Sequence, residues 1–186
     1  MDPTKLLEAD HRKVESLFSQ IVRAKGAKRT PLIKEITKSL DAHMKLEETV
    51  LYPAMKPVTG KDSVQESNTE HELARKALAE MLELAPDKPG FGAALEAVKA
   101  GIAHHVKEEE GEVFPKLRRE GKNILERIST PFMQTRLDLG MPMDAAALAA
   151  SATKDELLAE ARNAGIEGTT TMSKDELAKA LVSVMS

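Results

Sequence analysis

A short polar pattern occurs twice in this chain of 186 residues, at 43–53 and at 105–115. The two copies read HMKLEETVLYP and HVKEEEGEVFP. Each copy has a histidine, a glutamate four residues later, a second glutamate directly after it, and an apolar–aromatic–proline end. A further histidine behind an acidic residue precedes each copy, as Asp10-His11 and Glu70-His71. Ionisable residues repeated at equivalent places predict two similar halves that meet in one structure.

Apolar residues around these histidines recur at intervals of three and four, which places them on one helix face. Helices are predicted from 2 to 26, from 30 to 53, over 63–84 and from 91 into the 110s, with a further helical stretch over 116–128. Pro53 and Pro57 are expected to end the second helix, and Pro115 to bend or end the fourth. Long helices joined by short loops predict an all-α fold, an antiparallel up-down-up-down four-helix bundle.

The composition changes after residue 130, where prolines and glycines indicate a linker. Residues 153–156 and 173–176, TKDE and SKDE, are capping boxes and predict two short helices that form a small C-terminal helical hairpin. The predicted division is a bundle over 1–128, a linker over 129–150 and the hairpin over 151–186. The hairpin resembles SAP-like or Rho N-terminal-like helix–loop–helix modules, some of which bind nucleic acid. Its four basic and six acidic residues favour a packing or protein-contact role instead.

Histidine and glutamate four residues apart on a helix project from the same face. Two such pairs, with one histidine from each of the other two helices, would bring together four imidazoles and two carboxylates. The six candidate metal ligands are His11, His43, Glu47, His71, His105 and Glu109. Neighbouring buried carboxylates repel one another and lose several kcal/mol of hydration, whereas a pair of cations removes both penalties. Mixed imidazole and carboxylate ligands with open coordination positions suit iron or manganese, while zinc prefers four ligands.

On these motifs, roughly residues 1 to 125 resemble the hemerythrin-like, HHE cation-binding family. The resemblance implies a non-haem diiron site, with two iron ions joined by an oxo or hydroxo group. It also implies that the four repeat-related histidines are iron ligands and that Glu47 and Glu109 bridge the ions. Oxygen-carrying hemerythrins have a fifth histidine one turn after the third-helix histidine, where this chain has Arg75. That difference argues against reversible oxygen carriage.

Residues next to the ligands are expected to have lesser roles. Glu48 and Glu110 are rotated off the predicted site and are expected to be rim charges, with contact to a ligand histidine as the alternative. His104 is expected at the surface or beside the ligands. Tyr52 lies nine residues after His43, on the opposite face of a regular helix, so packing is expected. In the alternative, an irregularity near the following proline turns its phenolate toward an iron ion.

Composition excludes several classes of function. The chain has no cysteine, which rules out disulfides, thiolate zinc sites and cysteine-bound iron–sulfur clusters. Its formal net charge of −3 makes nucleic acid an unexpected partner. No apolar stretch is long enough for a membrane span, and the first residues do not read as a signal peptide, so a cytoplasmic location is expected.

The leading functional hypothesis is a non-haem diiron protein that binds, senses or turns over dioxygen, nitric oxide or peroxide. As an enzyme it would be a peroxide- or NO-consuming oxidoreductase supplied by an unidentified electron donor. Iron binding or storage without catalysis is one alternative. The other is an interaction protein that acts through the C-terminal module under control of the metal. The sequence does not specify the oligomeric state.

Overall fold

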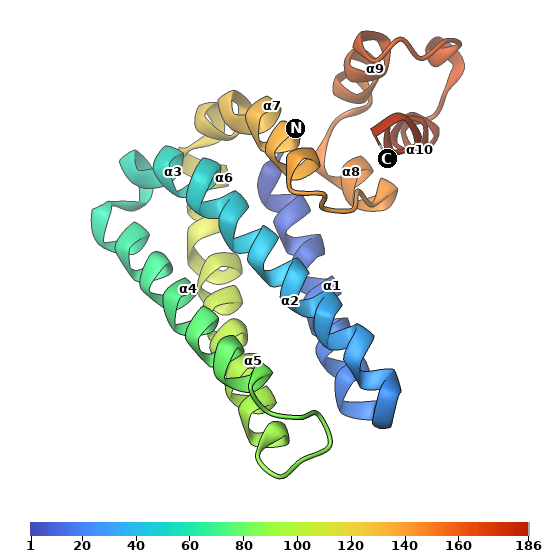
Figure 1. The fold of residues 1–186 in the computed structure, drawn as a ribbon. Helices are drawn as coiled ribbons and strands as arrows, with labels where there is room; N and C mark the ends of the chain where they lie inside the picture. Colours follow the sequence, from blue (N-terminus) through green and yellow to red (C-terminus); the bar gives the residue numbers. More distant parts are fainter. Residues whose placement is uncertain (186) are drawn as a thin grey trace.

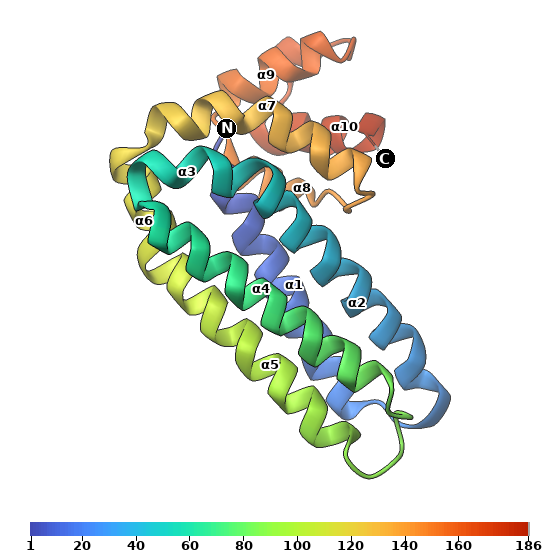
Figure 2. The ribbon, with the colours of Figure 1, turned by 60° about the vertical axis from the view of Figure 1, so that its left-hand side comes forward.

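The computed structural model describes residues 1–185, and this part of the chain is helical without strands. Four long helices run antiparallel beside one another, up and down in turn (Figure 1; Figure 2). They are α1 (Pro3–Arg23), α2 (Arg29–Leu46), α4 (Lys61–Leu82) and α5 (Phe91–Glu108). A short 3-10 turn, η1 (Gly26–Lys28), joins the first two. The predicted all-α, four-helix bundle is therefore confirmed.

Two of the long helices continue, through a change of helical geometry, past the prolines that close the two sequence repeats. The chain passes from α2 through a π-helical turn, η2 (Glu47–Leu51), into α3 (Tyr52–Thr59), and from α5 through η3 (Glu109–Val113) into α6 (Phe114–Glu120). The prediction that Pro53 and Pro57 end the second helix was wrong, because the helix continues to Thr59. Pro53 is the second residue after the π turn, so its missing N–H and its ring fall where the backbone bonding pattern is already changing. The break comes at Gly60, which has a φ of 96°.

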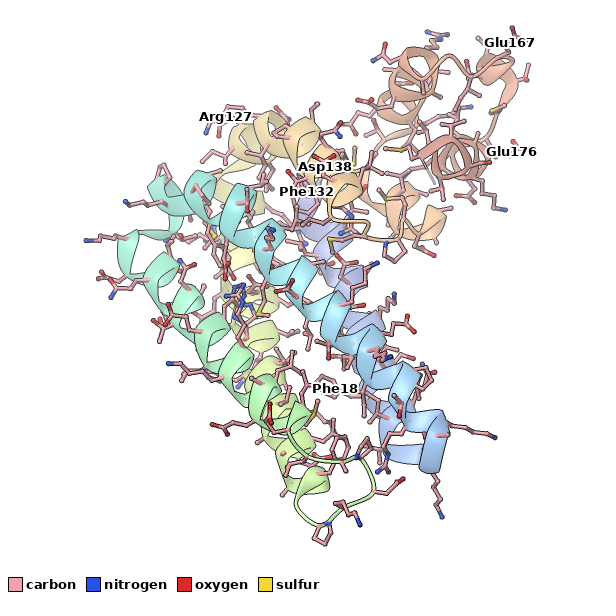
Figure 3. All side chains as sticks on the ribbon, in the orientation of Figure 1. Phe18, Arg127, Phe132, Asp138, Glu167 and Glu176 are labelled. Carbon is pink, nitrogen blue, oxygen red and sulfur yellow. The ribbon has the colours of Figure 1, made fainter. Side chains whose placement is uncertain are left out.

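The segment after the bundle is more helical than predicted. It contains α7 (Lys122–Asp138), α8 (Ala145–Ser151), α9 (Lys154–Asn163), the 3-10 turn η4 (Thr169–Thr171) and α10 (Lys174–Met185). Much of the predicted linker over 129–150 is thus the second half of α7 and most of α8. Phe132 and neighbouring apolar residues of α7 are buried against the bundle, which stabilises the helix in spite of Pro131. Figure 3 shows Phe132 beside the end of the bundle.

The predicted C-terminal hairpin is present as α9 and α10, which pack against each other beyond α7 and α8 (Figure 1). Both capping boxes form, with Thr153 Oγ1 accepting from the Glu156 N–H at 3.2 Å and Ser173 Oγ from the Glu176 N–H at 3.3 Å. The likeness to SAP-like modules and the division into parts stay predictions. Among the described residues, no helix has the length and apolarity required to span a membrane.

Two apolar clusters fill the molecule, one on each side of the level of the predicted ligands. One lies toward the turns that join α1 to α2 and α4 to α5, and includes Phe18, Ile36 and Phe91. The other, which we call the upper cluster, includes Leu6 and Phe132, and it continues into α8, α9 and α10. The polar residues at mid-height of the bundle therefore lie between two dry layers.

Candidate metal centre

The structure brings all six predicted ligands together at mid-height of the bundle, each no more than 5% exposed. Figure 3 shows side-chain nitrogen atoms gathered between the helices at this level. One histidine comes from each of α1, α2, α4 and α5, and one glutamate from the first position of each π turn. The twofold sequence repeat thus becomes a twofold arrangement of side chains around a common centre.

The imidazoles form two pairs that point their Nε2 atoms inward. His11 Nε2 lies 3.1 Å from His43 Nε2, and His71 Nε2 lies 3.2 Å from His105 Nε2. Ligand atoms that share one six-coordinate ion at about 2.1 Å are roughly 3 Å apart. Each histidine pair therefore has the spacing of two neighbouring ligands on one cation.

Glu47 and Glu109 lie between the two histidine pairs. Glu47 Oε1 is 3.3 Å from His43 Nε2, while its Oε2 is 3.4 Å from His71 Nε2. Glu109 Oε2 is 3.5 Å from His11 Nε2 and 3.6 Å from His105 Nε2. One carboxylate thus offers one oxygen to each pair, and the other places a single oxygen near both.

Three of these carboxylate oxygens make no hydrogen bond with the described residues although they are buried: both oxygens of Glu47 and Oε2 of Glu109. A buried carboxylate oxygen left without a partner costs free energy that a bound cation would recover. The donor set, the inward Nε2 atoms and these unpartnered oxygens therefore fit two cations.

The outward nitrogen of each imidazole faces a second carboxylate, so eight side chains form a ring around the centre. The pairs are His11 Nδ1 with Glu110 at 2.8 Å, His43 Nδ1 with Asp10 at 3.6 Å, His71 Nδ1 with Glu48 at 2.9 Å, and His105 Nδ1 with Glu70 at 2.7 Å. Each carboxylate comes from the helix next to the one that carries its histidine. Such partners keep the Nδ1 proton in place and direct Nε2 toward a metal. The prediction of Glu48 and Glu110 as rim charges was wrong, and the alternative, contact with a ligand histidine, is what the structure has.

Each of these outer carboxylates also contacts a positively charged or titratable group on its far side. Arg75, at the place of the carriers' fifth histidine, donates to both oxygens of Glu48 at 2.8 and 2.9 Å. Arg12 contacts Glu110, and Arg136 contacts Asp10. His104 is 64% exposed and lies 3.3 Å from Glu70, as expected for a surface residue next to a ligand. Fixed outer charges hold the carboxylates, and the carboxylates hold the imidazoles.

Tyr52 is inside the site and not on the opposite face, so the packing prediction was wrong for this residue. A π turn holds one more residue than an α turn, so it rotates the following residues by about 100° relative to a regular helix. The Tyr52 hydroxyl donates to Glu109 Oε1 at 3.2 Å and lies 3.1 Å from His71 Nε2. Phe114, the equivalent residue, stacks on the His11 ring with centroids 6.0 Å apart. The aromatic–proline end of both repeats was the sequence signal for this irregularity.

The charges of the metal-free site balance through the histidines. Burial alone would lower the pKa of His43, but Glu47 and Asp10 raise it to about 10. Burial has the same effect on His105, where Glu109 and Glu70 raise the pKa to about 9. Burial would raise the pKa of Glu47, but His43 and His71 hold it well below its usual range. Burial and the two nearby glutamates raise the pKa of Tyr52 well above its usual value, so the phenol is neutral. Protons thus supply the positive charge that a metal would otherwise provide.

An antiparallel helical bundle with a buried cluster of histidines and glutamates defines a cation-binding class of protein. Residues 2–117 match the model of the hemerythrin HHE cation binding domain, and the chain belongs to that family. A hemerythrin HHE cation binding domain-containing protein from Mycobacterium kansasii has a similar fold, with a TM-score of 0.62 at 19% identity. That alignment covers 97% of this chain and 99% of the other, so the fold likeness includes the C-terminal helices.

A curated relative, a DNA nickase from Nostoc sp. (strain PCC 7120), is 27% identical over 114 residues. The match covers 61% of this chain and 32% of the nickase. The chain therefore corresponds to about a third of that relative's length.

Proposed function

We propose that the protein holds a pair of non-haem iron ions at the four histidines and two glutamates, and uses them to bind, sense or turn over dioxygen, nitric oxide or peroxide. The observation that carries the proposal is the position of the Glu47 carboxylate. Its two oxygens are buried, make no hydrogen bond with the described residues, and each lie near a different histidine pair. A carboxylate in this position serves two cations at once, which favours a pair over a single ion. Mixed imidazole and carboxylate donors favour iron over zinc.

The protein's own residues supply geometry and exclude water. When bound, an iron pair supplies electrons and open coordination positions for a small ligand. The ring of outer carboxylates fixes the imidazoles, and the apolar clusters above and below limit access to small molecules. Ligands that are at most 5% exposed leave no room for a large substrate. This burial favours a diatomic molecule or peroxide as the ligand.

Tyr52 is the single tyrosine of the chain, and we include it in the functional site. Its hydroxyl is within 3.4 Å of Nε2 atoms of both His71 and His105. It can therefore complete one ion's ligand set as a phenolate, or stay protonated and donate to a bound small molecule. Replacement by phenylalanine keeps the packing and removes both options.

The test is iron content together with optical spectra of the oxidised, reduced, and O2-, NO- and peroxide-treated protein. We expect about two iron ions per chain and oxidised-state absorption bands that bleach on reduction. The His43→Ala, His105→Ala double variant should lose the bands and the iron. The His104→Ala variant should keep both, because the side chain of His104 is 64% exposed and its ring contacts Glu70 and Glu108, which are not among the six candidate ligands. Bands that persist in the double variant would show that the site lies elsewhere.

The same preparations separate the possible uses of the iron. Peroxide or NO that disappears in large excess over protein indicates turnover, whereas one equivalent consumed per iron pair indicates binding or sensing. A content well above two irons per chain would favour storage, the first alternative. An interaction that depends on both iron and residues 151–186 would favour the second.

DNA cleavage, as named for the Nostoc relative, is not part of this proposal. The similarity covers about a third of that protein. A phosphodiester of duplex DNA could not approach ligands this deeply buried, and the net charge of −3 does not favour a polyanion. We place the protein in the cytoplasm, where a chain without cysteine and with redox-active iron suits the reducing conditions.

A further inference from the structure

Arg136 is a buried cation at the end of α7, outside the residues that match the family model. Only 2% of its surface is exposed. Its guanidinium donates to both carboxylate oxygens of Asp10, with the Nη2 bond to Oδ1 at 3.0 Å. A two-pronged contact of this kind fixes the orientation of the carboxylate as well as its position.

Asp10 in turn faces His43, one of the six candidate ligands. Its Oδ2 is 3.6 Å from Nδ1 of His43, which is longer than the 2.7 to 2.9 Å of the other three outer pairs. His43 Nδ1 is buried and makes no hydrogen bond with the described residues. A cation bound at Nε2 would fix the position of the His43 ring and leave its Nδ1–H directed toward Asp10, so metal loading favours a closer and more rigid contact between the two side chains.

On its other side, Arg136 holds the start of the C-terminal segment, residues 139–185. Its Nη2 donates to the Pro142 carbonyl at 3.2 Å, and its own carbonyl accepts from the Met141 N–H at 3.0 Å. Just beyond, α8 packs on α1 and α10. A groove of about 850 Å3, lined in part by Asp10, Arg136 and Ala147, runs beside this contact.

We propose that Arg136 positions His43 through Asp10, and that this chain of contacts couples metal occupancy to the packing of the C-terminal segment. The inference rests on the proposed function, because it requires a cation at His43. The side chains next to the other three outer carboxylates, Arg12, Arg75 and His104, belong to the bundle helices themselves. Coupling between two sites is reciprocal, so a tightly packed segment also raises metal affinity.

The test measures amide hydrogen exchange of residues 139–151 in the full chain, with and without two equivalents of Fe(II) under anaerobic conditions. In the wild type, loading should slow exchange of this segment by about fivefold or more, the lower end of typical coupling. Arg136→Met should remove the difference between the loaded and metal-free forms. Arg136→Lys, which keeps the charge but loses the two-pronged contact, should restore part of it.

Arg75→Met is the matched control, because it removes the same kind of clamp from Glu48 without touching the C-terminal segment. It should speed iron release but leave the metal-dependent protection of 139–151 in place.

If Arg136→Met fails to fold, Asp10→Asn interrupts the same contacts from the other end and should give the same loss. This inference alone would be overturned if the wild type bound two ions and the amide exchange of residues 139–151 did not change. It would also be overturned if the Arg136→Met variant showed the same metal-dependent slowing of exchange as the wild type. Wild-type protein that binds no metal would overturn both proposals.

Discussion

At the scale of single residues, carboxylates surround the four imidazoles of the centre on their inner and outer sides. Each candidate ligand imidazole has its inner nitrogen near Glu47 or Glu109 and its outer nitrogen toward a second carboxylate. Without metal, the buried glutamates are compensated by protons on His43 and His105, whose pKa values are about 10 and 9. Metal ions and protons therefore compete for the same nitrogens.

This competition predicts proton release on metal binding. At pH 7 both His43 and His105 are protonated in the metal-free protein, and a cation at Nε2 must displace one proton from each. We expect about two protons per chain to be released, with affinity rising as pH rises and levelling off above pH 9 to 10. Titration with Mn(II) in weakly buffered solution with a pH indicator measures this release. His104→Ala should release the same number, and affinity that stays constant from pH 7 to 9 would contradict the prediction.

At the scale of elements, the π turns η2 and η3 position the glutamates and the aromatic side chains of the site. Each begins with one of the two candidate ligand glutamates and is followed by an aromatic residue and a proline. The extra residue rotates Tyr52 and Phe114 toward the centre, where they are at most 1% exposed. Burial of these rings offsets the poorer hydrogen-bond geometry of the wide turns.

Inserting one residue into η2 should undo this rotation. Thr49 is exposed, so an alanine inserted after it displaces no packed side chain but adds one residue to the turn. Tyr52 and Met55 would then rotate by about 100° out of their buried positions. We expect a loss of roughly 3–5 kcal/mol in unfolding free energy, the scale of losing a large buried side chain.

Urea unfolding followed by circular dichroism gives the size of this loss. Thr49→Ala is the control, because it keeps the chain length and should change stability by less than about 0.5 kcal/mol. An insertion variant as stable as the control would mean that the orientation set by the π turn does not contribute to stability.

At the scale of the whole molecule, the bundle and the C-terminal helices share the upper cluster. Leu148, Leu157 and Leu177 are almost fully buried in the same cluster as Leu6 of α1. Polar contacts also cross, since the Asp2 N–H donates to the Ser151 carbonyl and the Met1 ammonium pairs with Glu156. The C-terminal segment is therefore expected to unfold together with the bundle.

A substitution in α8 tests that expectation. Leu148→Ala leaves a cavity in the shared cluster and should cost about 2–5 kcal/mol. Tyr52 lies deep in the bundle and is the single tyrosine, so its near-ultraviolet signal reports unfolding there. We expect that signal to melt at a lower temperature in the variant. Leu73→Ala, at a leucine 59% exposed on α4, is the control and should leave it unchanged. An unchanged Tyr52 transition in Leu148→Ala would mean that the C-terminal helices unfold separately.

The sequence by itself determined the four bundle helices and the six side chains that meet. The spacing of apolar residues places His11, His43, His71 and His105 on inner faces, because that spacing is set locally by the helical period. The same local chemistry predicted both C-terminal capping boxes. Whether the six are metal ligands stays a prediction.

Tertiary structure alone decided the rest of the site and the extent of the C-terminal helices. The rotation of Tyr52 depends on a widened turn, and that turn is favourable only because its aromatic residue is buried against neighbouring helices. The hydrogen bonds between Arg136 and Asp10 join residues that are 126 apart in sequence, and no local sequence pattern predicts such a contact. The helix through Pro131 likewise persists because its apolar face packs on the bundle. Local periodicity fixes which side of a helix a residue occupies, whereas the gain from packing against distant segments decides where regular geometry is broken or extended.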